Sequence, residues 1–589
     1  MAAFSKILVA NRGEIAVRIF RTLRELGIAT VAVYSEADRG SLHVTAADEA
    51  YLIGPGPASE SYLNQERLLE TAARAGAEAV HPGYGFLAEN AGFARACVTA
   101  GLVWIGPPPE AIELMGSKTA AREAMRAAGV PIVPGTTDPV DSVETVQRLG
   151  EEIGWPIAIK AAAGGGGKGL RVVGGPDQAE RAYESARREG EAYFADPTVY
   201  VERYLEDPRH VEVQVLADDH GNVIHLGERD CTIQRRHQKL VEETPSPAVG
   251  NQLREQIGKL GVDAATAVGY RSAGTIEGLL DREGNYFFLE MNTRIQVEHT
   301  VTELVTGLDL VREQVLIAAG EPLSLGQNDV RLAGHAIECR INAEDPSNGF
   351  LPSPGRISTY REPAGPGVRV DSGVTAGSEV VGIYDPLIAK LVVHGVDRDH
   401  ARRRMLRALG EYEIDGVTTL LGFHQALLEH PCFVAGETCQ GVVESKELAE
   451  QAEQLSHRKT TIASSPDGRL RERVARVELD GRLYEVKALV PEPPFAELAR
   501  RRRERIAHGA HHGAAKDAVV TPMQGTVLAV EVADGSEVHA GQVICIVEAM
   551  KMENEITAHR DGVVTDLSVE PGQPVTTGQV VCVIAQQET

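Results

Sequence analysis

The sequence predicts a multidomain protein in which α/β and α+β domains precede an all-β domain. Its 589 residues allow about four domains of roughly 150 residues each. The chain opens with a short apolar strand, a polar turn and an amphipathic helix, an alternation typical of an open parallel sheet. It ends with a motif that occurs twice: Gly525 and Gly562, and likewise Cys545 and Cys582, are 37 residues apart.

The composition excludes several classes of protein. Apolar residues make up 43% of the chain and charged residues 24%, as in globular proteins rather than disordered or coiled-coil ones. A formal net charge of −25 argues against nucleic acid or an anionic membrane as the main partner. The seven cysteines contain no C-x-x-C pair, so we expect neither a disulfide framework nor a zinc site. We find no signal or transit peptide and no long apolar run, and expect a cytoplasmic protein.

The first domain is predicted from its alternating elements. Residues 6–10 are an apolar strand, residues 15–26 carry a helical pattern that Gly27 ends, and residues 30–34 form a second strand. The first turn lacks the G-x-G-x-x-G fingerprint, so no dinucleotide site is predicted.

Changes in pattern along the chain divide it into five parts. A Gly-rich loop and a polar strand pair characterise the second part, and a further α+β unit follows it. A Pro-rich linker with a hairpin signal around Asp480 and Gly481 comes next, and the repeated β motif closes the chain. The predicted boundaries are 1–114, 115–330, 331–446, 447–517 and 518–589.

The Gly-rich loop at 164–169 follows a predicted strand but lacks the spacing of a Walker A loop. Glycine backbone N–H groups can nonetheless close over phosphates. A flexible hairpin would explain the loop equally well. Lys118 and Lys160 favour the phosphate interpretation, because they could supply positive charge.

A polar strand pair suggests a metal site. Glu277 lies on one strand and Glu290 and Asn292 on its neighbour, and alternation places Arg294, Gln296 and Glu298 on the same face. Clustered carboxylates repel unless a cation neutralises them, and Mg²⁺ prefers such oxygen ligands. The alternative is an exposed strand with salt bridges.

Lys551 lies between the two copies of the C-terminal motif, where a hairpin would present it at an exposed tip. An ordinary surface lysine is the alternative. However, Ala549-Met550-Lys551-Met552 resembles the biotin attachment motif of biotin carboxyl carrier domains. Lipoyl domains usually carry an acidic residue where this chain has Met550.

Four longer motifs extend this resemblance to residues 4–446. They are His81 to Gly85, Arg229 to Lys239, Asn292 to His299 and Glu338 to Pro346, and they resemble biotin carboxylase. More broadly, the set of Glu277, Glu290 and Asn292 with Lys118, Lys160 and the Gly-rich loop resembles the ATP-grasp fold. Together with the carrier motif, the chain resembles the α chain of biotin-dependent acyl-CoA carboxylases of the acetyl- or propionyl-CoA type. The resemblance implies a Rossmann-like preATP-grasp domain, an ATP-grasp domain with a lid at about 131–204, a biotin carboxylase C-terminal domain and a flattened barrel of the biotinyl or lipoyl type.

The resemblance also implies a role for individual residues. Biotin would be attached to Lys551, Glu298 would be the catalytic base, and Arg340 would lie beside the reacting biotin. The implied metal ligands for Mg²⁺ or Mn²⁺ are Glu277, Glu290 and Asn292. Bicarbonate would be held by Lys239, Arg294, Gln296 and Val297. The residues implied to contact ATP are Lys118, Lys160, Gly165, Gly166, Glu202, Leu205, His210, Gln234, His237 and Leu279.

The function implied is carboxylation of biotin by ATP and bicarbonate through carboxyphosphate. A separate carboxyltransferase β subunit would then carboxylate acetyl-CoA or propionyl-CoA, with methylcrotonyl-CoA or a longer acyl-CoA as the alternative. A biotin protein ligase and a homodimer through the carboxylase part are also implied. Two other interpretations are another ATP-grasp ligase with a lipoyl-like domain, and a carrier or scaffold whose catalytic half is inactive.

Overall fold

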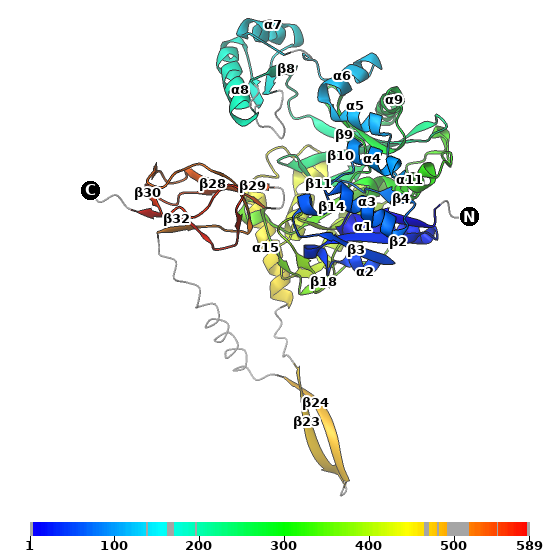
Figure 1. Cartoon of the computed structure of the whole chain (residues 1–589), viewed down its shortest axis with the longest axis vertical. Coiled ribbons are helices and arrows are strands. Elements are labelled where there is room, and N and C mark those ends of the chain that lie inside the picture. The colour runs from blue at the N-terminus through cyan, green and yellow to red at the C-terminus, as the bar shows by residue number, and fades with distance from the viewer. Residues whose placement is uncertain are drawn as a thin grey trace. The chain divides into compact units, whose positions relative to one another are not determined.

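The computed structural model describes residues 4–136, 139–161, 170–194, 197–463, 470–479, 482–491, 517–549 and 552–585 (Figure 1). The chain divides into two compact units. The first comprises Met1–Val381 and Pro386–Ala452, and the second comprises Gly382–Asp385 and Glu453–Thr589. Among the helices described, none is both long and apolar enough to span a membrane.

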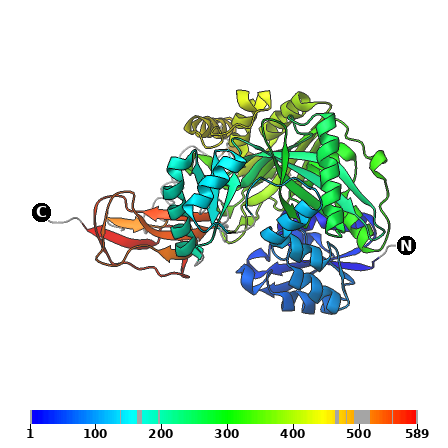
Figure 2. The ribbon, with the colours of Figure 1, turned by 90° about the horizontal axis from the view of Figure 1, so that it is seen from above.

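The first unit begins with a five-stranded parallel sheet in the order β3-β2-β1-β4-β5. Figure 2 shows this part of the chain in blue, with its helices around the sheet. The predicted strand–helix–strand opening is confirmed. Its elements are β1 (Lys6–Val9), α1 (Gly13–Glu25), β2 (Ala29–Ser35), β3 (Glu49–Gly54), α3 (Gln65–Ala75), β4 (Ala79–His81), α4 (Ala91–Thr99) and β5 (Val103–Trp104).

An eight-stranded antiparallel sheet forms the centre of the first unit, in the order β13-β12-β9-β10-β11-β14-β21-β19. The sheet runs without a break across the boundary predicted at residue 330, because β11 pairs with β14. Its strands are β9 (Arg209–Ala217), β10 (Val223–Arg235), β11 (Gln238–Thr244), β12 (Ser272–Leu280), β13 (Tyr286–Asn292), β14 (His335–Asn342), β19 (Val368–Ser372) and β21 (Leu387–Gly395).

A smaller layer falls within the predicted lid at 131–204. Three strands in the order β7-β6-β8 pack with two helices around an apolar core of their own, which includes Val146, Ile159 and Val201. Figure 1 shows α7, α8 and β8 together. The elements are α7 (Val143–Ile153), β6 (Ile157–Ala161), β7 (Leu170–Val173), α8 (Ala179–Phe194) and β8 (Val199–Arg203). The Gly-rich loop, with Gly165 and Gly166, lies outside the described residues.

Helices and one disulfide complete the first unit. Two helices of the predicted α+β unit are α12 (Arg398–Glu411) and α13 (Leu421–Glu429). The sequence predicted no disulfide framework and did not foresee the single bond that joins Cys432 to Cys439. Helix α14 (Pro431–Ala435) ends at Gly436 in the left-handed conformation, and the reversing chain brings the two Cα atoms to 5.5 Å. Since the cysteines are seven residues apart, no familiar spacing signals the pair.

The predicted linker at 447–517 contains more regular structure than the sequence suggested. Helix α15 (Lys446–Ala463) occupies its start, where Leu448 and Ala452 are buried. The predicted hairpin is longer than expected, because β23 (Leu470–Leu479) pairs along its whole length with β24 (Arg482–Pro491) (Figure 1).

The C-terminal domain has the two-fold sandwich that the repeat predicts. Its sheets have the orders β25-β32-β30-β27 and β29-β28-β26-β31. Corresponding glycines explain part of the repeat. A Cβ at Gly525 would lie 2.3 Å from the carbonyl oxygen of Glu548, and one at Gly562 would lie 2.4 Å from that of Ala585. The strands are β25 (Ala518–Val520), β26 (Gly525–Val530), β27 (Glu537–Val538), β28 (Val543–Ala549), β29 (Met552–Thr557), β30 (Gly562–Thr565), β31 (Pro574–Val575) and β32 (Val580–Ala585).

A hairpin of this domain brackets the predicted attachment site. Strand β28 pairs with β29, and Ala549 lies opposite Met552. Lys551 itself lies outside the described residues, so its attachment role stays a prediction.

The motif that begins at His81 has a structural role in the turn after β4. His81 is buried, and its Nδ1 accepts a hydrogen bond from the backbone N–H of Gly83 at 3.0 Å. Burial lowers the pKa of His81 to about 3, because the charged imidazolium would lose its hydration. The folded protein therefore holds this imidazole neutral.

This burial predicts a loss of stability in acid. Below pH 6.5 the unfolded chain binds a proton at His81 that the folded chain does not, so stability falls as the pH drops from about 6.5 towards 3. From pH 7.5 to pH 5 this site should cost about 2 kcal/mol. His81→Asn keeps an acceptor for Gly83. Between pH 7.5 and pH 5, we expect its free energy of unfolding, measured in urea, to fall by about 2 kcal/mol less than that of the parent. The exposed His220 provides the control, and an equal effect of His220→Asn would contradict the explanation.

Candidate active site

The candidate site lies on one face of the eight-stranded sheet, within the first unit. Strand β9 carries polar residues at every second position, His210, Glu212 and Gln214, between buried valines. Strands β10, β11, β12 and β14 add Arg229, Lys239, Glu277 and Arg340 to this site, as the contacts below establish.

Lys239 lies at the centre of the site. Its ammonium is 2.6 Å from Glu212 Oε2, 2.9 Å from Glu277 Oε1 and 2.5 Å from Glu298 Oε1. Burial alone would lower the pKa of Lys239, but the three carboxylates outweigh it and raise the pKa well above its usual value. Lys239 is therefore a permanent cation that holds three carboxylates together.

Glu298 is completely buried and bound by two cations. Besides Lys239, Arg340 Nη2 donates to Glu298 Oε2 at 3.0 Å. Burial would raise the pKa of Glu298, but Lys239, Arg340 and Arg229 together lower it well below its usual value. Glu298 is thus held ionised, the state that a proton acceptor needs.

The predicted metal ligands lie on adjacent strands. Glu277 is directly opposite Glu290 in the pairing of β12 with β13, and Asn292 Nδ2 donates to Glu277 Oε1 at 2.7 Å. Glu290 is exposed at the edge of the site, and Asn292 Oδ1 accepts from Arg294 at 3.0 Å. Their oxygen atoms are the ligand type that Mg²⁺ or Mn²⁺ takes. A second grouping, His210, Glu212 and Glu277, brings three ligand atoms within 4.8 Å of one another.

Arg294 is fixed by three side-chain acceptors and by the carbonyl of Ile295. Its guanidinium donates to Glu89 Oε2 at 2.8 Å, to Gln296 Oε1 at 2.8 Å and to Asn292 Oδ1 at 3.0 Å. Gln296 in turn donates to Glu277 Oε1 at 3.0 Å. Because Glu89 comes from the N-terminal domain, that domain contributes directly to the site.

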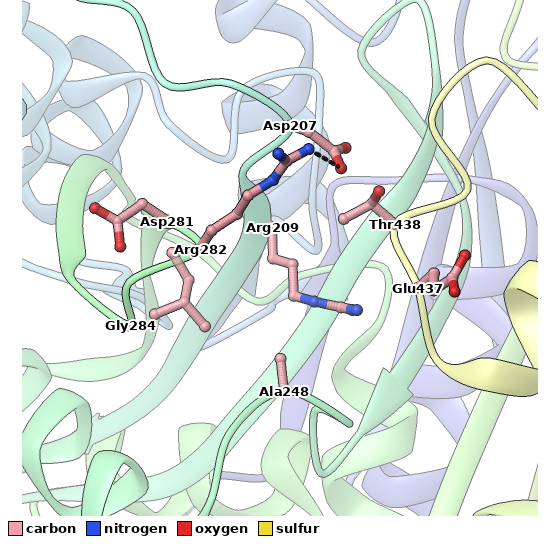
Figure 3. Close-up of a pocket in the computed structure, with 9 residues that line it drawn as sticks. Asp207, Arg209, Ala248, Asp281, Arg282, Gly284, Glu437 and Thr438 are labelled. Atoms are coloured by element: carbon pink, nitrogen blue, oxygen red, sulfur yellow. Dashed lines mark hydrogen bonds and ion pairs between the residues drawn. The ribbon is translucent and has the colours of Figure 1, made fainter.

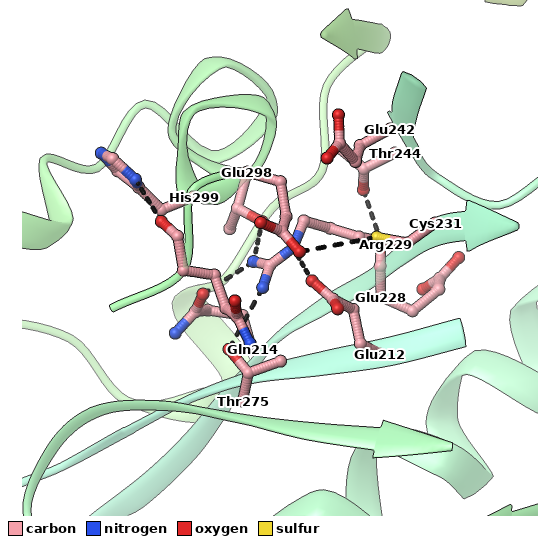
Figure 4. Close-up of polar contacts among 12 residues, drawn as sticks. Glu212, Gln214, Glu228, Arg229, Cys231, Glu242, Thr244, Thr275, Glu298 and His299 are labelled. Carbon is pink, nitrogen blue, oxygen red and sulfur yellow. Dashed lines mark hydrogen bonds and ion pairs between the residues drawn. The ribbon is translucent and has the colours of Figure 1, made fainter. Parts of the chain in front are cut away.

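Beneath the site lies a buried arginine that the sequence analysis did not include among the site residues. Arg229 is fully buried and donates to Glu212 Oε1 at 2.6 Å, Gln214 Oε1 at 2.7 Å, Thr302 Oγ1 at 3.0 Å and Thr275 Oγ1 at 3.1 Å. Figure 4 shows Glu212, Gln214 and Thr275 around it. Arg229 therefore fixes Glu212, one of the three carboxylates around Lys239.

The residues predicted to contact ATP are more widely spread. Lys160 on β6 forms an ion pair with Glu202 on β8, and Lys118 is exposed at the start of helix α6 (Lys118–Ala127). His210 Nε2 is hydrogen-bonded to Glu277 Oε2 at 2.7 Å. The remaining predicted ATP contacts lie on or next to strands β9 to β12. Leu205 is buried, and Leu279 pairs with His210. Gln234 Nε2 donates to the Cys231 carbonyl, and His237 is exposed at the β10–β11 turn.

Val297 contributes its backbone to a different contact, because its carbonyl accepts from Lys390 Nζ at 2.9 Å. The structure thus gathers Lys239, Glu277, Asn292, Arg294, Gln296, Glu298, Arg340 and His210 in one network. Lys160 and Glu202 form a separate pair.

A cavity of about 400 Å³ lies elsewhere on the sheet (Figure 3). Arg209 and Leu280 line it, and these residues alternate with His210 and Leu279 along β9 and β12. The cavity therefore opens on the opposite face of the sheet from the candidate site. None of the predicted site residues lines it.

Four protein-family models match the chain. They are described as the biotin carboxylase N-terminal domain (residues 3–112), the ATP-binding domain of the carbamoyl-phosphate synthase L chain (117–325), the biotin carboxylase C-terminal domain (338–445) and a biotin-requiring enzyme domain (517–584).

Relatives of known identity agree with these models. Biotin carboxylase 1 of Bacillus subtilis is 55% identical over 433 residues, which cover 73% of this chain and 96% of that protein. The chain belongs to the biotin carboxylase family. It is an ATP-grasp enzyme with an appended biotinyl domain.

Two further relatives match the present chain over nearly its whole length. The biotin-dependent acyl-coenzyme A carboxylase alpha3 subunit of Mycobacterium leprae is 46% identical and covers 95% of each chain. The propionyl-CoA carboxylase alpha chain of Ruegeria pomeroyi is 39% identical and covers 95% of this chain and 97% of that protein.

Among solved structures, the biotin carboxylase domain of Hydrogenobacter thermophilus 2-oxoglutarate carboxylase, in complex with MgADP, ADP and bicarbonate, is 49% identical. It has a TM-score of 0.69 and covers 77% of this chain and 98% of that one. A biotin carboxylase from Campylobacter jejuni is 46% identical, with a TM-score of 0.70 and coverage of 74% and 98%.

Arg229 provides a test of the network. Arg229→Met should leave Glu212 buried with one cation fewer, and we expect a loss of about 3–5 kcal/mol in the free energy of unfolding, measured in urea. Arg236→Met, at an exposed turn position of the same β10–β11 hairpin, is the control and should cost less than about 0.5 kcal/mol. Equal losses in the two variants would show that Arg229 does not stabilise the site.

Proposed function

We propose that the chain carboxylates biotin carried on Lys551 of its own C-terminal domain, using ATP and bicarbonate. The observation that supports this most directly is the network of Lys239, Glu298 and Arg340, in a chain that also has a biotin-requiring domain. The complex of the Hydrogenobacter relative with MgADP and bicarbonate supports the choice of substrates.

Bicarbonate is a poor nucleophile, so it must be held in line with the γ-phosphate and lose its proton. Lys239, Arg294, Gln296 and Val297 would hold it, and the ionised Glu298 would accept the proton. Carboxyphosphate would form next and release CO₂ and phosphate, and the phosphate would take the N1 proton of biotin as the N–C bond to CO₂ forms. Arg340, already bound to Glu298, would face the biotin that receives the CO₂.

The nucleotide would lie between the sheet and the small layer of β6, β7 and β8. Its proposed contacts are Lys118, Lys160, Glu202, Leu205, His210, Gln234, His237 and Leu279, with Gly165 and Gly166 closing over the phosphates as part of a lid at 131–204. Glu277, Glu290 and Asn292 would bind Mg²⁺ or Mn²⁺, which would offset phosphate charge when bound. We retain the domain boundaries predicted from the sequence in this proposal.

A separate carboxyltransferase β subunit would take the carboxyl group from biotin and pass it to a short-chain acyl-CoA, acetyl-CoA or propionyl-CoA. The names of the Mycobacterium and Ruegeria relatives, each matched over 95% of this chain, support this assignment. A methylcrotonyl-CoA or longer-chain enzyme is the alternative. We further propose a cytoplasmic homodimer that a biotin protein ligase modifies.

The β23–β24 ribbon is the proposed docking element for the β subunit. A two-stranded ribbon is marginal by itself in water, and pairing or packing against another protein would stabilise it. Deletion of residues 474–486 should weaken co-purification of the β subunit while ATP cleavage by the carboxylase part continues. Unchanged assembly would exclude this role.

Attachment of biotin can be tested by avidin capture from native lysate followed by mass spectrometry. We expect biotin on Lys551, co-elution of a carboxyltransferase subunit, and loss of capture in Lys551→Arg. An unmodified Lys551 in cells with an active biotin ligase would exclude the carrier role and favour another ATP-grasp ligase.

The catalytic role can be tested by replacing the proposed base. Glu298→Gln should reduce bicarbonate-dependent ADP release by at least about 100-fold, since general-base catalysis contributes about that much, while ATP binding persists. Glu255→Gln, at an exposed position on helix α9 (Asn251–Ala267), is the matched control. Normal turnover in Glu298→Gln would refute the assignment.

A further inference from the structure

Behind Arg340, two buried carboxyl groups face one another. Glu242 on β11 lies directly opposite Glu338 on β14, and both side chains are fully buried. Like charges at directly opposed positions of neighbouring strands destabilise a sheet. This arrangement therefore needs a physical explanation.

Each of the two carboxyl groups has one satisfied and one unsatisfied oxygen. Glu242 Oε1 accepts from Arg340 Nε at 2.6 Å, and Glu338 Oε2 accepts from the hydroxyl of Thr300. Within the described part of the chain, Glu242 Oε2 and Glu338 Oε1 are buried without a hydrogen-bond partner. Opposed Cβ atoms are typically about 4.5–5.5 Å apart, so carboxyl groups at such positions can reach one another.

Glu242 also determines where Arg340 points. The guanidinium donates to Glu242 through Nε and to Glu298 Oε2 through Nη2, at 2.6 and 3.0 Å. Arg340 is thus held between Glu298, the proposed base, and Glu242, to which the sequence analysis gave no role. Arg340 is about 16% exposed, so one part of it remains open to the site.

The charges around the pair favour a bound proton. The charged and titratable groups nearby are Arg340 and Cys339 on β14, Lys239 on β11, Cys231 on β10, Glu298 before helix α10 (His299–Thr306) and Lys390 on β21. Lys239 is already bound to three other carboxylates. Arg340 would face three negative charges if Glu242, Glu338 and Glu298 were all ionised.

We propose that Glu242 is a positioning residue for Arg340, and that Glu242 and Glu338 share one proton so that the pair orients Arg340 without cancelling its charge. The O–H of one carboxyl group donates to the unsatisfied oxygen of the other, which leaves one negative charge on the pair. The proposal rests on the role proposed above for Arg340 beside biotin.

The titration of the pair agrees with this geometry. Burial raises the pKa of Glu242 to about 8 and that of Glu338 to about 7, although Arg340 opposes the shift of Glu242 and Lys390 that of Glu338. One proton is therefore present near neutral pH and is lost in alkali. Loss of the shared proton adds a second negative charge behind Arg340.

The test uses the full chain with Lys551→Arg and added free biotin, so that steps with and without biotin are measured separately. Glu242→Leu should lower the biotin-dependent rate at least about tenfold, because Arg340 Nε loses its buried acceptor. Bicarbonate-dependent ADP release without biotin should fall less than the biotin-dependent rate, since Glu242 reaches the proposed base Glu298 only through Arg340.

Glu243→Leu is the matched control. Glu243 is the neighbouring buried carboxylate on β11, but it binds Arg398 and His335 on the other face of the strand. If Glu243→Leu and Glu242→Leu have equal effects on the biotin-dependent rate, or if Glu242→Leu lowers both rates equally, the positioning role is wrong.

The shared proton has its own readouts. In Glu338→Gln the amide N–H can donate to the ionised Glu242, so the pair carries at most one negative charge, however alkaline the solution. The alkaline fall in the biotin-dependent rate, expected near pH 8 in the parent, should then move to higher pH. The infrared band of a protonated carboxyl group should weaken in Glu338→Gln at pH 7, while the contribution of Glu14 persists, because burial raises the pKa of Glu14 to about 7 as well.

The proposal of a shared proton would be wrong if the biotin-dependent rate of Glu338→Gln fell at the same alkaline pH as in the parent, or if the infrared band were unchanged. These outcomes are distinct from a failure of the proposed function, because a chain that does not carboxylate biotin would show no biotin-dependent rate in the parent.

Discussion

The candidate site depends on one buried cation. Lys239 lies within 3 Å of Glu212, Glu277 and Glu298, which come from β9, β12 and the segment before α10. Without this ammonium, three neighbouring carboxylates would be buried together, and each uncompensated buried charge costs several kcal/mol. Lys239 is also one of the residues proposed to hold bicarbonate, so the group that stabilises the site would take part in anion binding as well.

The continuous sheet explains how distant parts of the chain reach this cation. Strand β11 carries Lys239 and pairs with β10 on one side and β14 on the other. Residues on β9, β12 and β13 therefore lie to one side of Lys239, and Arg340 on β14 lies to the other. A one-residue slip of β14 would turn Arg340 to the opposite face. The register between β11 and β14 thus keeps Arg340, which is proposed to lie beside biotin, on the same face of the sheet as Lys239, which is proposed to hold bicarbonate.

The spacing of residues within short segments predicted many of the site residues. Most of those it missed reach the site through contacts between segments that are distant in the sequence. The strand alternation predicted from Glu290 to Glu298 holds only as far as Asn292, where β13 ends; Arg294, Gln296 and Glu298 join the network from the segment that leads into α10. Glu89, Arg229 and Glu242 enter the site through partners that are distant in sequence, and no local pattern identifies those partners. Glu212 could have been found, since it stands between valines on an otherwise apolar strand.

The disulfide and the helix α15 were missed for related reasons. Cys432 and Cys439 meet only because Gly436 ends a short helix and reverses the chain. In α15 the buried contacts of Leu448 and Ala452, and not a strong sequence signal, favour a helix where a linker was predicted.

The charge balance of the site raises a last point. Six carboxylates, Glu89, Glu212, Glu242, Glu277, Glu298 and Glu338, belong to the network around four cations, Arg229, Lys239, Arg294 and Arg340. A site with this excess of negative charge would repel ATP and bicarbonate. A divalent cation at Glu277, Glu290 and Asn292 would correct the excess on the nucleotide side. A proton on the Glu242–Glu338 pair would correct it beside Arg340, where no metal is proposed. On these two proposals, anion binding at the site would depend on a bound metal ion and on a bound proton, which lie on opposite sides of Lys239 in the sheet.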